Sequence, residues 1–417
     1  MKYKTYKIKD LINEISMGPF GSNIKVECFV DSGIPVLNGS NLTGFALNDN
    51  SFRYVTPEKA DSLGKANAYR GDIVITHRGT LGQIVFIPEN SKHSRYVISQ
   101  SQFRVKCNEK VLPEYLVYYF HTNAGQHKLL SNASQVGVPA LARASTTFQT
   151  LEIDIPDVTE QRKIVDLLET IREKIELNNA INNNLEQQAQ AIFKEWFIDN
   201  PENENWSNGT FSELIQSTLS GDWGKEAPTG NNIEKVYCVR GADIPEVKAG
   251  NKGKMPTRYI LPKNYASKKL TAGDIVVEIS GGSPTQSTGR CTAISESLLN
   301  RYDSGMVCTN FCRAIKPLSG YSMFIYYYWQ YLYDKGVFFS YENGTTGIKN
   351  LDISGFLGTE PIIIPPKEKV LAFDDYCQTV FDRIFANGKE SEQLSQLRDT
   401  LLPKLMSGEL DVSDIEI

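Results

Sequence analysis

Residues 156–197 read PDVTEQRKIVDLLETIREKIELNNAINNNLEQQAQAIFKEWF, and this stretch decides the fold. Its apolar side chains recur at alternating steps of four and three, the spacing that keeps one face of a helix against a partner helix. This seam consists of Ile164, Leu168, Ile171, Ile175, Asn178, Asn182, Leu185, Ala189, Ile192 and Trp196. Asp157 and Glu160 form a capping-box pattern, and the next glycine or proline is Pro201. At ~1.5 Å per residue the predicted helix is about 60 Å long, too long for the core of one compact domain.

A second copy of the seam lies 209 residues further along the chain. Its positions are Phe373, Cys377, Val380, Ile384, Asn387, Ser391, Leu394, Arg398, Leu401 and Leu405. Both copies are polar at the centre, and antiparallel pairing would bring the two polar centres together, where a slip in register would bury amides against aliphatic carbon. We therefore expect an intramolecular antiparallel coiled coil rather than one surface helix packed on a domain. Gly388 is expected to interrupt the second helix near its centre.

The stretch before each helix is also duplicated. Gly18 and Gly21 recur as Gly221 and Gly224 at an offset of 203, and the tetrapeptide 71–74 recurs identically at 273–276. Residues 102–104 recur loosely at 310–313. Offsets that drift from about 202 to 209 indicate a duplication with loop insertions. We predict an α+β chain of two tandem mixed α/β domains with two long helices, related by a pseudo-twofold internal repeat. The expected segments are 1–156 (first domain), 157–200 (central helix), 206–366 (second domain), 367–410 (distal helix) and 411–417 (tail).

Short elements are expected inside the first domain from turn residues and apolar runs. The predicted strands cover residues 34–37, 72–76, 83–87 and 102–106. A helical turn is expected at 10–15, an aromatic helix at 113–121 and a loop at 131–147.

Composition fits a globular protein of several domains. The chain has 417 residues, of which 41% are hydrophobic and 22% charged, and it contains no apolar run long enough for a membrane span. Its N-terminus lacks the apolar core of a signal peptide, and its seven cysteines have no metal-binding spacing, so we expect a cytoplasmic protein with reduced thiols and no bound metal. Cys308 and Cys312 are expected on the buried face of one strand.

Charge is distributed unevenly between the two kinds of segment. Residues 1–156 carry a net charge of +4 and residues 206–364 of +2, whereas 157–205 carry −6 and 365–417 carry −5. Weakly basic domains beside acidic helices suit a polyanion on the domains and a different partner on the helices.

Catalytic motifs are missing from the sequence, while groups suited to DNA are frequent in its expected loops. No phosphate-binding loop or methyltransferase motif occurs, and Glu246-Val247-Lys248 only weakly imitates a nuclease site. We therefore predict no catalytic residues. Candidate DNA-binding residues, chosen because Arg, Lys, Asn, Gln, His, Ser and Thr bind base edges or phosphates, are Lys25, Asn41, His77, Arg78, Thr80, Gln83, Gln100, Gln102, Gln135 and Arg143 in the first domain. In the second domain they are Lys225, Arg240, Ser283, Thr285, Gln286, Thr288, Arg290, Lys349 and Asn350.

With these features the chain resembles the specificity subunits of type I restriction-modification systems. The resemblance rests on the order of four motifs: the box 18–22 (GPFGS), the tetrapeptide 71–74 (GDIV), residues 155–164 (IPDVTEQRKI) and the ending 401–410 (LLPKLMSGEL). The tetrads 177–180, 181–184 and 185–188 resemble the short repeats of the family's central helix. The second half departs from the pattern at Gly221-Asp222-Trp223-Gly224 and at Glu368-Lys369.

The resemblance implies a non-catalytic subunit whose two target recognition domains each bind one half of a bipartite double-stranded DNA target. The helices would set the spacing and dock two methyltransferase subunits, and through them the restriction subunits. S-adenosylmethionine, ATP and magnesium would then bind the partner subunits, and this chain would hold no cofactor. The alternatives are an enzyme, such as a nuclease or fused methyltransferase that uses one domain for recognition, and a structural coiled-coil adaptor.

Overall fold

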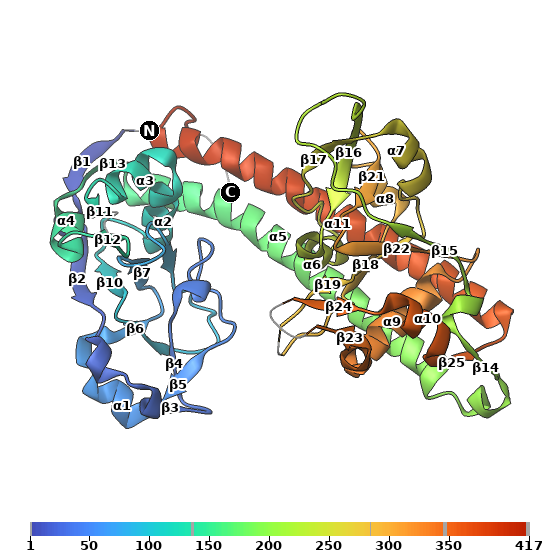
Figure 1. The fold of residues 1–417 in the computed structure, drawn as a ribbon. Helices are drawn as coiled ribbons and strands as arrows, with labels where there is room; N and C mark the ends of the chain where they lie inside the picture. The colour runs from blue at the N-terminus through green and yellow to red at the C-terminus, as the bar shows by residue number, and fades with distance from the viewer. Residues whose placement is uncertain (1, 135–136, 284, 345–347, 414–417) are drawn as a thin grey trace. The chain divides into compact units, whose positions relative to one another are not determined.

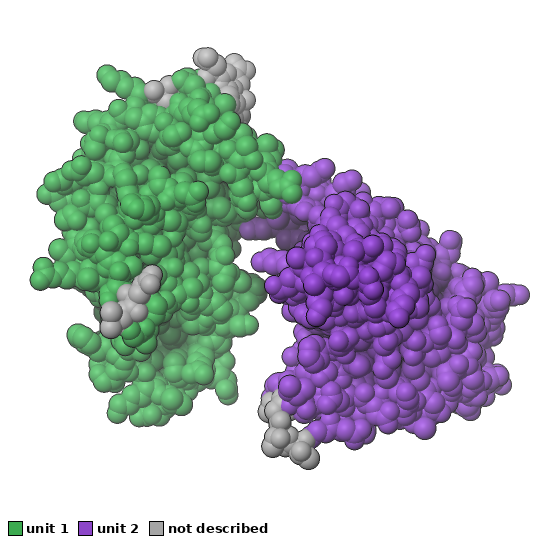
Figure 2. Space-filling view, turned by 45° about the horizontal axis from the view of Figure 1, so that its top comes forward, with its two compact units in different colours: residues 1–172, 395–417 green, residues 173–394 purple. Residues whose placement is uncertain are grey.

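The computed structural model describes residues 2–134, 137–283, 285–344 and 348–413. The chain forms two compact units, of which unit 1 comprises residues 1–172 and 395–417 and unit 2 comprises residues 173–394 (Figure 2). Each long helix contributes residues to both units. The predicted fold class, an α+β chain with two tandem mixed α/β domains and two long helices, is confirmed. Within the described residues no helix is long and apolar enough to cross a membrane.

Two helices are far longer than the rest (Figure 1). Helix α5 spans Val158–Phe193 and continues into a π-helical turn, Lys194–Ile198, while α11 spans Lys367–Ser407. Asp157 caps α5 by accepting a hydrogen bond from the backbone N–H of Glu160 at 3.0 Å. The expected interruption at Gly388 is wrong, because α11 runs through it. A Cβ at Gly388 would lie 2.0 Å from the carbonyl oxygen of Gly250. Glycine therefore allows a loop of unit 2 to approach the helix closely at this position.

The described residues of unit 1 form four antiparallel or mixed sheets. The strands, in order within each sheet, are β1 (Lys4–Lys7) and β13 (Glu152–Ile155); β2 (Ile12–Met17), β10 (Gln102–Cys107), β7 (Ile73–Thr76) and β8 (Ile84–Phe86); β11 (Ala133–Ser134) and β12 (Ala140–Leu141); and β3 (Phe29–Val30), β5 (Arg53–Val55), β4 (Ile34–Val36), β9 (Arg95–Val97) and β6 (Asn67–Tyr69). The short helices are α1 (Pro57–Ser62), α2 (Pro113–His121), α3 (Asn123–Leu129) and α4 (Ala144–Thr150).

Unit 2 repeats much of this plan. Its sheets are β14 (Ser207–Thr210) and β25 (Pro361–Ile364); β15 (Ile215–Ser220), β22 (Cys312–Pro317), β18 (Ile275–Glu278) and β20 (Cys291–Ala293); β17 (Thr257–Ile260), β16 (Glu234–Val239) and β21 (Met306–Cys308); and β19 (Ser280–Gly281), β24 (Lys349–Leu351) and β23 (Glu342–Asn343). Its short helices are α6 (Ile244–Lys248), α7 (Pro262–Lys268), α8 (Glu296–Leu299), α9 (Ser322–Asp334) and α10 (Ile353–Thr359).

The internal repeat is visible in equivalent backbone contacts. The sheet order β2-β10-β7-β8 of unit 1 recurs as β15-β22-β18-β20 in unit 2. A Cβ added at Gly18 would lie 1.9 Å from the carbonyl oxygen of Ser99, and one added at Gly221 would lie 1.8 Å from that of Thr309. Strand register corrects one expected match, because residue 103 corresponds to residue 313 and not to residue 311. Phe103 pairs with Ile75 in β7, and Arg313 pairs with Val277, the equivalent residue of β18.

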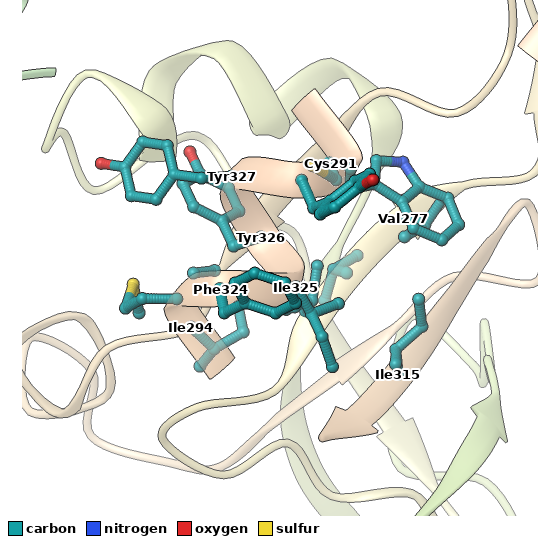
Figure 3. Packing of buried hydrophobic residues seen from close by; sticks show 14 of the residues in the cluster. Val277, Cys291, Ile294, Ile315, Phe324, Ile325, Tyr326 and Tyr327 are labelled. Atoms are coloured by element: carbon teal, nitrogen blue, oxygen red, sulfur yellow. The ribbon is translucent and has the colours of Figure 1, made fainter. Parts of the chain in front are cut away.

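The core of each unit surrounds an aromatic helix. Helix α2 in unit 1 occupies the predicted residues 113–121, and α9 is its counterpart in unit 2. Figure 3 shows Phe324, Ile325, Tyr326 and Tyr327 of α9 beside residues of strands β18, β20 and β22. Both cores also include one face of α5 and α11, so each long helix is anchored in both units.

Several local predictions need correction. Residues 12–15 form part of strand β2, because the turn ends at Asp10. The expected loop 131–147 contains β11, β12 and the start of α4. Cys308 ends β21 and Cys312 begins β22, so both thiols are buried but on different strands. The prediction of a single strand failed because the turn between Cys308 and Cys312 contains no glycine or proline to mark it in the sequence.

Candidate nucleic-acid interface

In unit 1, the sequence-predicted loops meet at one edge of the β2-β10-β7-β8 sheet. Strand β7 ends at Thr76, and its neighbours β8 and β10 begin nearby, at Ile84 and Gln102. The backbone N–H of His77 donates to the carbonyl oxygen of Ser101 at 2.9 Å, which joins two loops. The backbone N–H of Leu141 donates to the carbonyl oxygen of His77 at 2.9 Å, which adds strand β12 to the same edge. We call this group of loops edge 1.

Edge 1 presents exposed polar side chains. The exposed candidates at edge 1 are Arg78, Thr80, Gln100 and Arg143, and Lys25, also exposed, lies elsewhere in unit 1, before strand β3. Among the described residues neither Arg78 nor Arg143 forms an ion pair within unit 1, so both guanidinium groups face solvent. Arg143 has a φ of +48°, a left-handed conformation that costs a non-glycine residue roughly 1–2 kcal/mol. Such strain is typical of functional positions, where the surrounding fold holds an unfavourable backbone conformation.

Other candidates of unit 1 hold the loops together instead. The Asn41 side chain accepts from the backbone N–H of Asn38 at 3.0 Å and donates to the carbonyl oxygens of Asn48 and Asn50. The buried Gln102 side chain accepts from the backbone N–H of Ser99 at 2.9 Å. Their polar atoms are used inside the fold and are not offered to a ligand in this conformation.

Two further candidates lie at edge 1, half-buried. Gln83 bonds the Thr76 hydroxyl at 3.1 Å and donates to the Gly39 carbonyl oxygen at 3.0 Å. The Nε2 atom of His77 lies 3.1 Å from the carbonyl oxygen of Gln100, a contact that requires Nε2 to carry the proton. Burial lowers the pKa of His77 below its usual range, so this imidazole is neutral at pH 7. Gln135 lies outside the described residues.

The equivalent edge of unit 2 is built by the same backbone contacts. The N–H of Ile279 donates to the carbonyl oxygen of Phe311 at 2.9 Å, as His77 does to Ser101. The N–H of Leu351 donates to the carbonyl oxygen of Ile279 at 2.8 Å, as Leu141 does to His77. These contacts bring the sheet of β19, β24 and β23 to the ends of β18 and β22 (Figure 1). We call this group of loops edge 2.

Cationic candidates of unit 2 are bound to carboxylates of the same unit. Arg290 donates twice to Glu278, at 2.8 Å each, and Lys349 donates to Glu342 at 2.7 Å. Arg240 pairs with Asp243 at 2.9 Å. Although burial alone would raise it, the hydrogen bonds from Lys349 and Thr288 hold the pKa of Glu342 below its usual range.

The remaining candidates of unit 2 are neutral apart from Lys225. Lys225, Thr285, Gln286 and Asn350 are exposed. Ser283 is half-buried and caps the turn by accepting from the N–H groups of Thr285 and Gln286, at 3.3 and 3.0 Å. Thr288 is buried, and its hydroxyl donates to Glu342 at 3.0 Å. Edge 2 therefore offers hydroxyl and amide groups, and its candidate cations Arg290 and Lys349 are paired with glutamates.

Edge 2 also carries exposed apolar residues that the sequence reasoning missed. Phe311 and Ile348 are 62% and 61% exposed, respectively. A search for polar side chains excluded them, and only their exposure sets them apart from core residues. No cluster of His, Cys, Asp and Glu among the described residues could hold a metal ion.

The seam of the long helices is polar at its centre in unit 2. The Asn387 side chain donates to the Asn182 side chain at 2.8 Å, and the Asn182 side chain donates to the Ile384 carbonyl oxygen at 2.9 Å. Asn178 donates to the Ser391 hydroxyl at 3.3 Å. Higher numbers on α5 meet lower numbers on α11, so the helices are antiparallel here. These bonds satisfy the amide nitrogens of Asn178, Asn182 and Asn387, each of which would cost about 1–3 kcal/mol if buried without a partner, whereas the buried Oδ1 of Asn178 has no partner among the described residues.

The apolar seam positions are divided between the two cores. Those buried or packed in the core of unit 1 are Ile164, Leu168, Leu401 and Leu405. Those in the core of unit 2 are Leu185, Ala189, Ile192, Trp196, Phe373, Cys377, Val380 and Ile384. Ile171 is buried, whereas Ile175 and Leu394 are half-buried. Arg398, the charged exception, lies over the Phe45 ring at 5.0 Å in unit 1.

Comparison with known proteins shows which proteins this chain is similar to. Residues 2–187 match the family model of the type I restriction modification DNA specificity domain. The MjaIX type I restriction enzyme specificity subunit of Methanocaldococcus jannaschii is 26% identical over 98% of this chain and 94% of its own. The HindI type I restriction enzyme specificity subunit of Haemophilus influenzae is 24% identical over 88% of this chain and 93% of its own.

A solved structure agrees on the fold. The crystal structure of a type I restriction-modification system S subunit from M. genitalium has a TM-score of 0.56, with 14% identity over 97% of this chain and 96% of that one. This likeness concerns the fold, and the match to the DNA specificity domain model is confined to residues 2–187. Over nearly its whole length the chain is similar to proteins named as specificity subunits of type I restriction enzymes.

Proposed function

We propose that this chain binds a bipartite double-stranded DNA target, with edge 1 on one half-site and edge 2 on the other. The observation that carries this proposal is the duplicated edge. The hydrogen bonds His77–Ser101 and Ile279–Phe311 occupy equivalent places in two copies of one sheet. Because the frameworks are equivalent while the exposed side chains differ, the two half-sites should differ in sequence.

The long helices would set the spacing between the half-sites. Helix α5 is continuous from residues of unit 1 into residues of unit 2, and α11 returns in the opposite direction. The bonded centre formed by Asn178, Asn182, Asn387 and Ser391 would fix the register of the pair, since a slip would leave buried amides without partners.

The same helices would dock two methyltransferase subunits, and the restriction subunits would join through them. Their segments carry net charges of −6 and −5, which suits a protein partner and disfavours DNA. S-adenosylmethionine, ATP and magnesium would bind those partners, and this chain would supply only recognition and spacing.

The experiment is a comparison of the full chain with and without its methyltransferase partner. We expect sequence-specific DNA binding and adenine or cytosine methylation only with the partner, at a bipartite target mapped by methylome sequencing. Methylation or cleavage by the purified chain alone would favour the fused-enzyme alternative. Binding to a perfect palindrome would contradict two different half-sites, and no DNA binding with the partner present would favour a structural adaptor.

Lengthening both helices tests the spacing. Seven extra residues in each, at the unit boundary between Arg172 and Glu173 and between Leu394 and Ser395, preserve the seam and add ~10.5 Å. We expect unchanged half-sites and an unread gap about three base pairs longer, measured by methylome sequencing. A single tetrad after Gln188 would instead displace residues packed in the core of unit 2. New half-sites with the old gap would show that the helices do not set the spacing.

A further inference from the structure

Phe311 and the exposed Asn310 lie at edge 2 between two buried residues, Thr309 and Cys312. Phe311 is 62% exposed, whereas Thr309 and Cys312 are 3% and 1% exposed. Its carbonyl oxygen accepts from the N–H groups of Ile279 at 2.9 Å and of Ser280 at 3.3 Å. The fold therefore fixes the backbone at this position and leaves the ring in solvent.

The fold does not require a large apolar side chain at this position. In unit 1 the equivalent carbonyl belongs to Ser101, which accepts from His77 at the same distance of 2.9 Å. Only the backbone takes part in this contact, so the side chain is free to vary between the two units. A single exposed ring is ordinary on a protein surface, but a ring grouped with other exposed apolar side chains indicates a binding role.

Other apolar side chains lie on the same edge. Ser280 pairs with Asn350 in the β19–β24 ladder, next to Lys349 and the 61% exposed Ile348. Phe339 is 45% exposed, and the Lys349 ammonium lies 4.8 Å from the centre of its ring. Edge 2 thus combines apolar groups with the amides and hydroxyls of Asn350, Gln286 and Thr285.

Charge at edge 2 favours bases over phosphates as the contacted groups. Two cations of edge 2, Arg290 and Lys349, are held by Glu278 and Glu342, and Arg313, two residues after Phe311, is half-buried and has no ion pair among the described residues. Phosphates are bound mainly by uncompensated cations and by hydrogen-bond donors, whereas an aromatic ring gains nothing from contact with a phosphate. In the major groove, the apolar feature that distinguishes one base from the others is the C5-methyl group of thymine.

We propose that Phe311 is a specificity-determining residue that packs against the C5-methyl group of a thymine in the half-site bound by edge 2. This inference rests on the proposed function, because it assumes that edge 2 faces DNA. It assigns to unit 2 an apolar mode of base recognition at the position where unit 1 has a serine.

The test uses the full chain with its methyltransferase partner and duplexes containing the mapped target. Each thymine of the second half-site is replaced singly by deoxyuridine, which lacks only the methyl group. We expect one such replacement to weaken binding by the wild-type complex about fourfold, the value of one buried methyl-sized group. Phe311→Ala should weaken binding to the thymine duplex by at least that factor and lose the discrimination between thymine and deoxyuridine at that position.

Ile233→Ala provides the matched control. Ile233 is 63% exposed and precedes β16, whose opposite end carries the hydrogen bond from Thr309 to Val239. This variant should leave affinity and discrimination unchanged. Circular dichroism and the melting temperature should be the same for both variants and the wild type.

Several outcomes would overturn the inference. One is a second half-site without thymine, and another is a Phe311→Ala variant that still discriminates thymine from deoxyuridine. An equal loss on every duplex would indicate an apolar wedge between base steps instead of a methyl contact. A wild-type complex that binds no bipartite target would contradict the proposed function itself, so the two failures are distinguishable.

Discussion

Edges 1 and 2 share a backbone framework and differ in what they expose. Edge 1 presents two arginines, Arg78 and Arg143, that have no carboxylate partner in the part of the chain that the structure describes. The arginine and lysine of edge 2, Arg290 and Lys349, are bound to glutamates. Edge 2 instead exposes Phe311 and Ile348. The difference shows that duplication preserved the hydrogen bonds that position the loops and left the surface side chains free to diverge. Equivalent frameworks therefore do not imply equivalent DNA sequences.

The largest expected effect comes from the ion pairs made by Asp72 and Asp274, which precede β7 and β18 in the two units. In unit 1 the Arg104 side chain is 5% exposed and forms ion pairs with Asp72 at 3.3 Å and Glu14 at 2.9 Å. In unit 2 the Lys316 side chain is 23% exposed and forms an ion pair with Asp274. Arg104→Met should reduce the free energy of unfolding by about 3–5 kcal/mol, because it leaves Asp72 buried without a cation. Lys316→Met should cost less, since its site is more open to water. Chemical denaturation measures both, and equal losses would contradict this ranking.

The two close-approach glycines test whether the frameworks are equivalent. Gly18→Ala and Gly221→Ala would each place a Cβ within 2 Å of a backbone carbonyl, so both should lose about 1–3 kcal/mol of stability. Each should weaken the binding of its own half-site. Gly358→Ala, in α10 with open space around it, should be neutral or slightly stabilising. If only one of the two glycine variants is destabilised, the frameworks are not equivalent.

Arginine replacement separates binding from stability at the two edges. Arg78→Ala should weaken or relax only the first half-site, by about 1–3 kcal/mol if the side chain contacts a base, and should leave the melting temperature unchanged. Arg290→Ala should lower the melting temperature as well, because Glu278 loses its partner. Binding assays on duplexes altered in one half-site, combined with thermal melts, distinguish the two outcomes. A loss of stability in Arg78→Ala would contradict the placement of the Arg78 side chain in solvent.

The smallest expected effect is a pH dependence confined to edge 1. His77 has a pKa lowered by burial, and its counterpart in edge 2 is Ile279, which does not titrate. A folded-state pKa below the unfolded value of ~6.5 means that the unfolded chain binds more protons, so stability falls as the pH drops below that value. His77→Gln should reduce this decrease, measured as the difference in unfolding free energy between pH 7 and pH 5.5. An unchanged difference would show that His77 does not contribute.

Some of the fold could be predicted because it depends on local pattern. The period of the seam predicted the long helices, and turn residues around apolar runs predicted β4, β7, β8, β10 and α2. The prediction failed where distant contacts decide local structure. Gly388 lies inside α11, and a glycine stands there because the backbone at Gly250 comes too close for a side chain. Residues 102–104 correspond to residues 312–314 because the two segments pair with equivalent positions of their neighbouring strands. Neither partner is near in sequence.

The sequence by itself determined the duplication, the period and polar centre of the long helices, and the resemblance to specificity subunits, because these properties are written in residue order and spacing. Only the tertiary structure decided which candidate side chains are available to DNA. Asn41, Gln102 and Thr288 are used inside the fold, Arg290 is bound to Glu278, and Arg78 and Phe311 face solvent. The physical reason is that a side chain's partners are set by strands and loops brought together from distant parts of the chain.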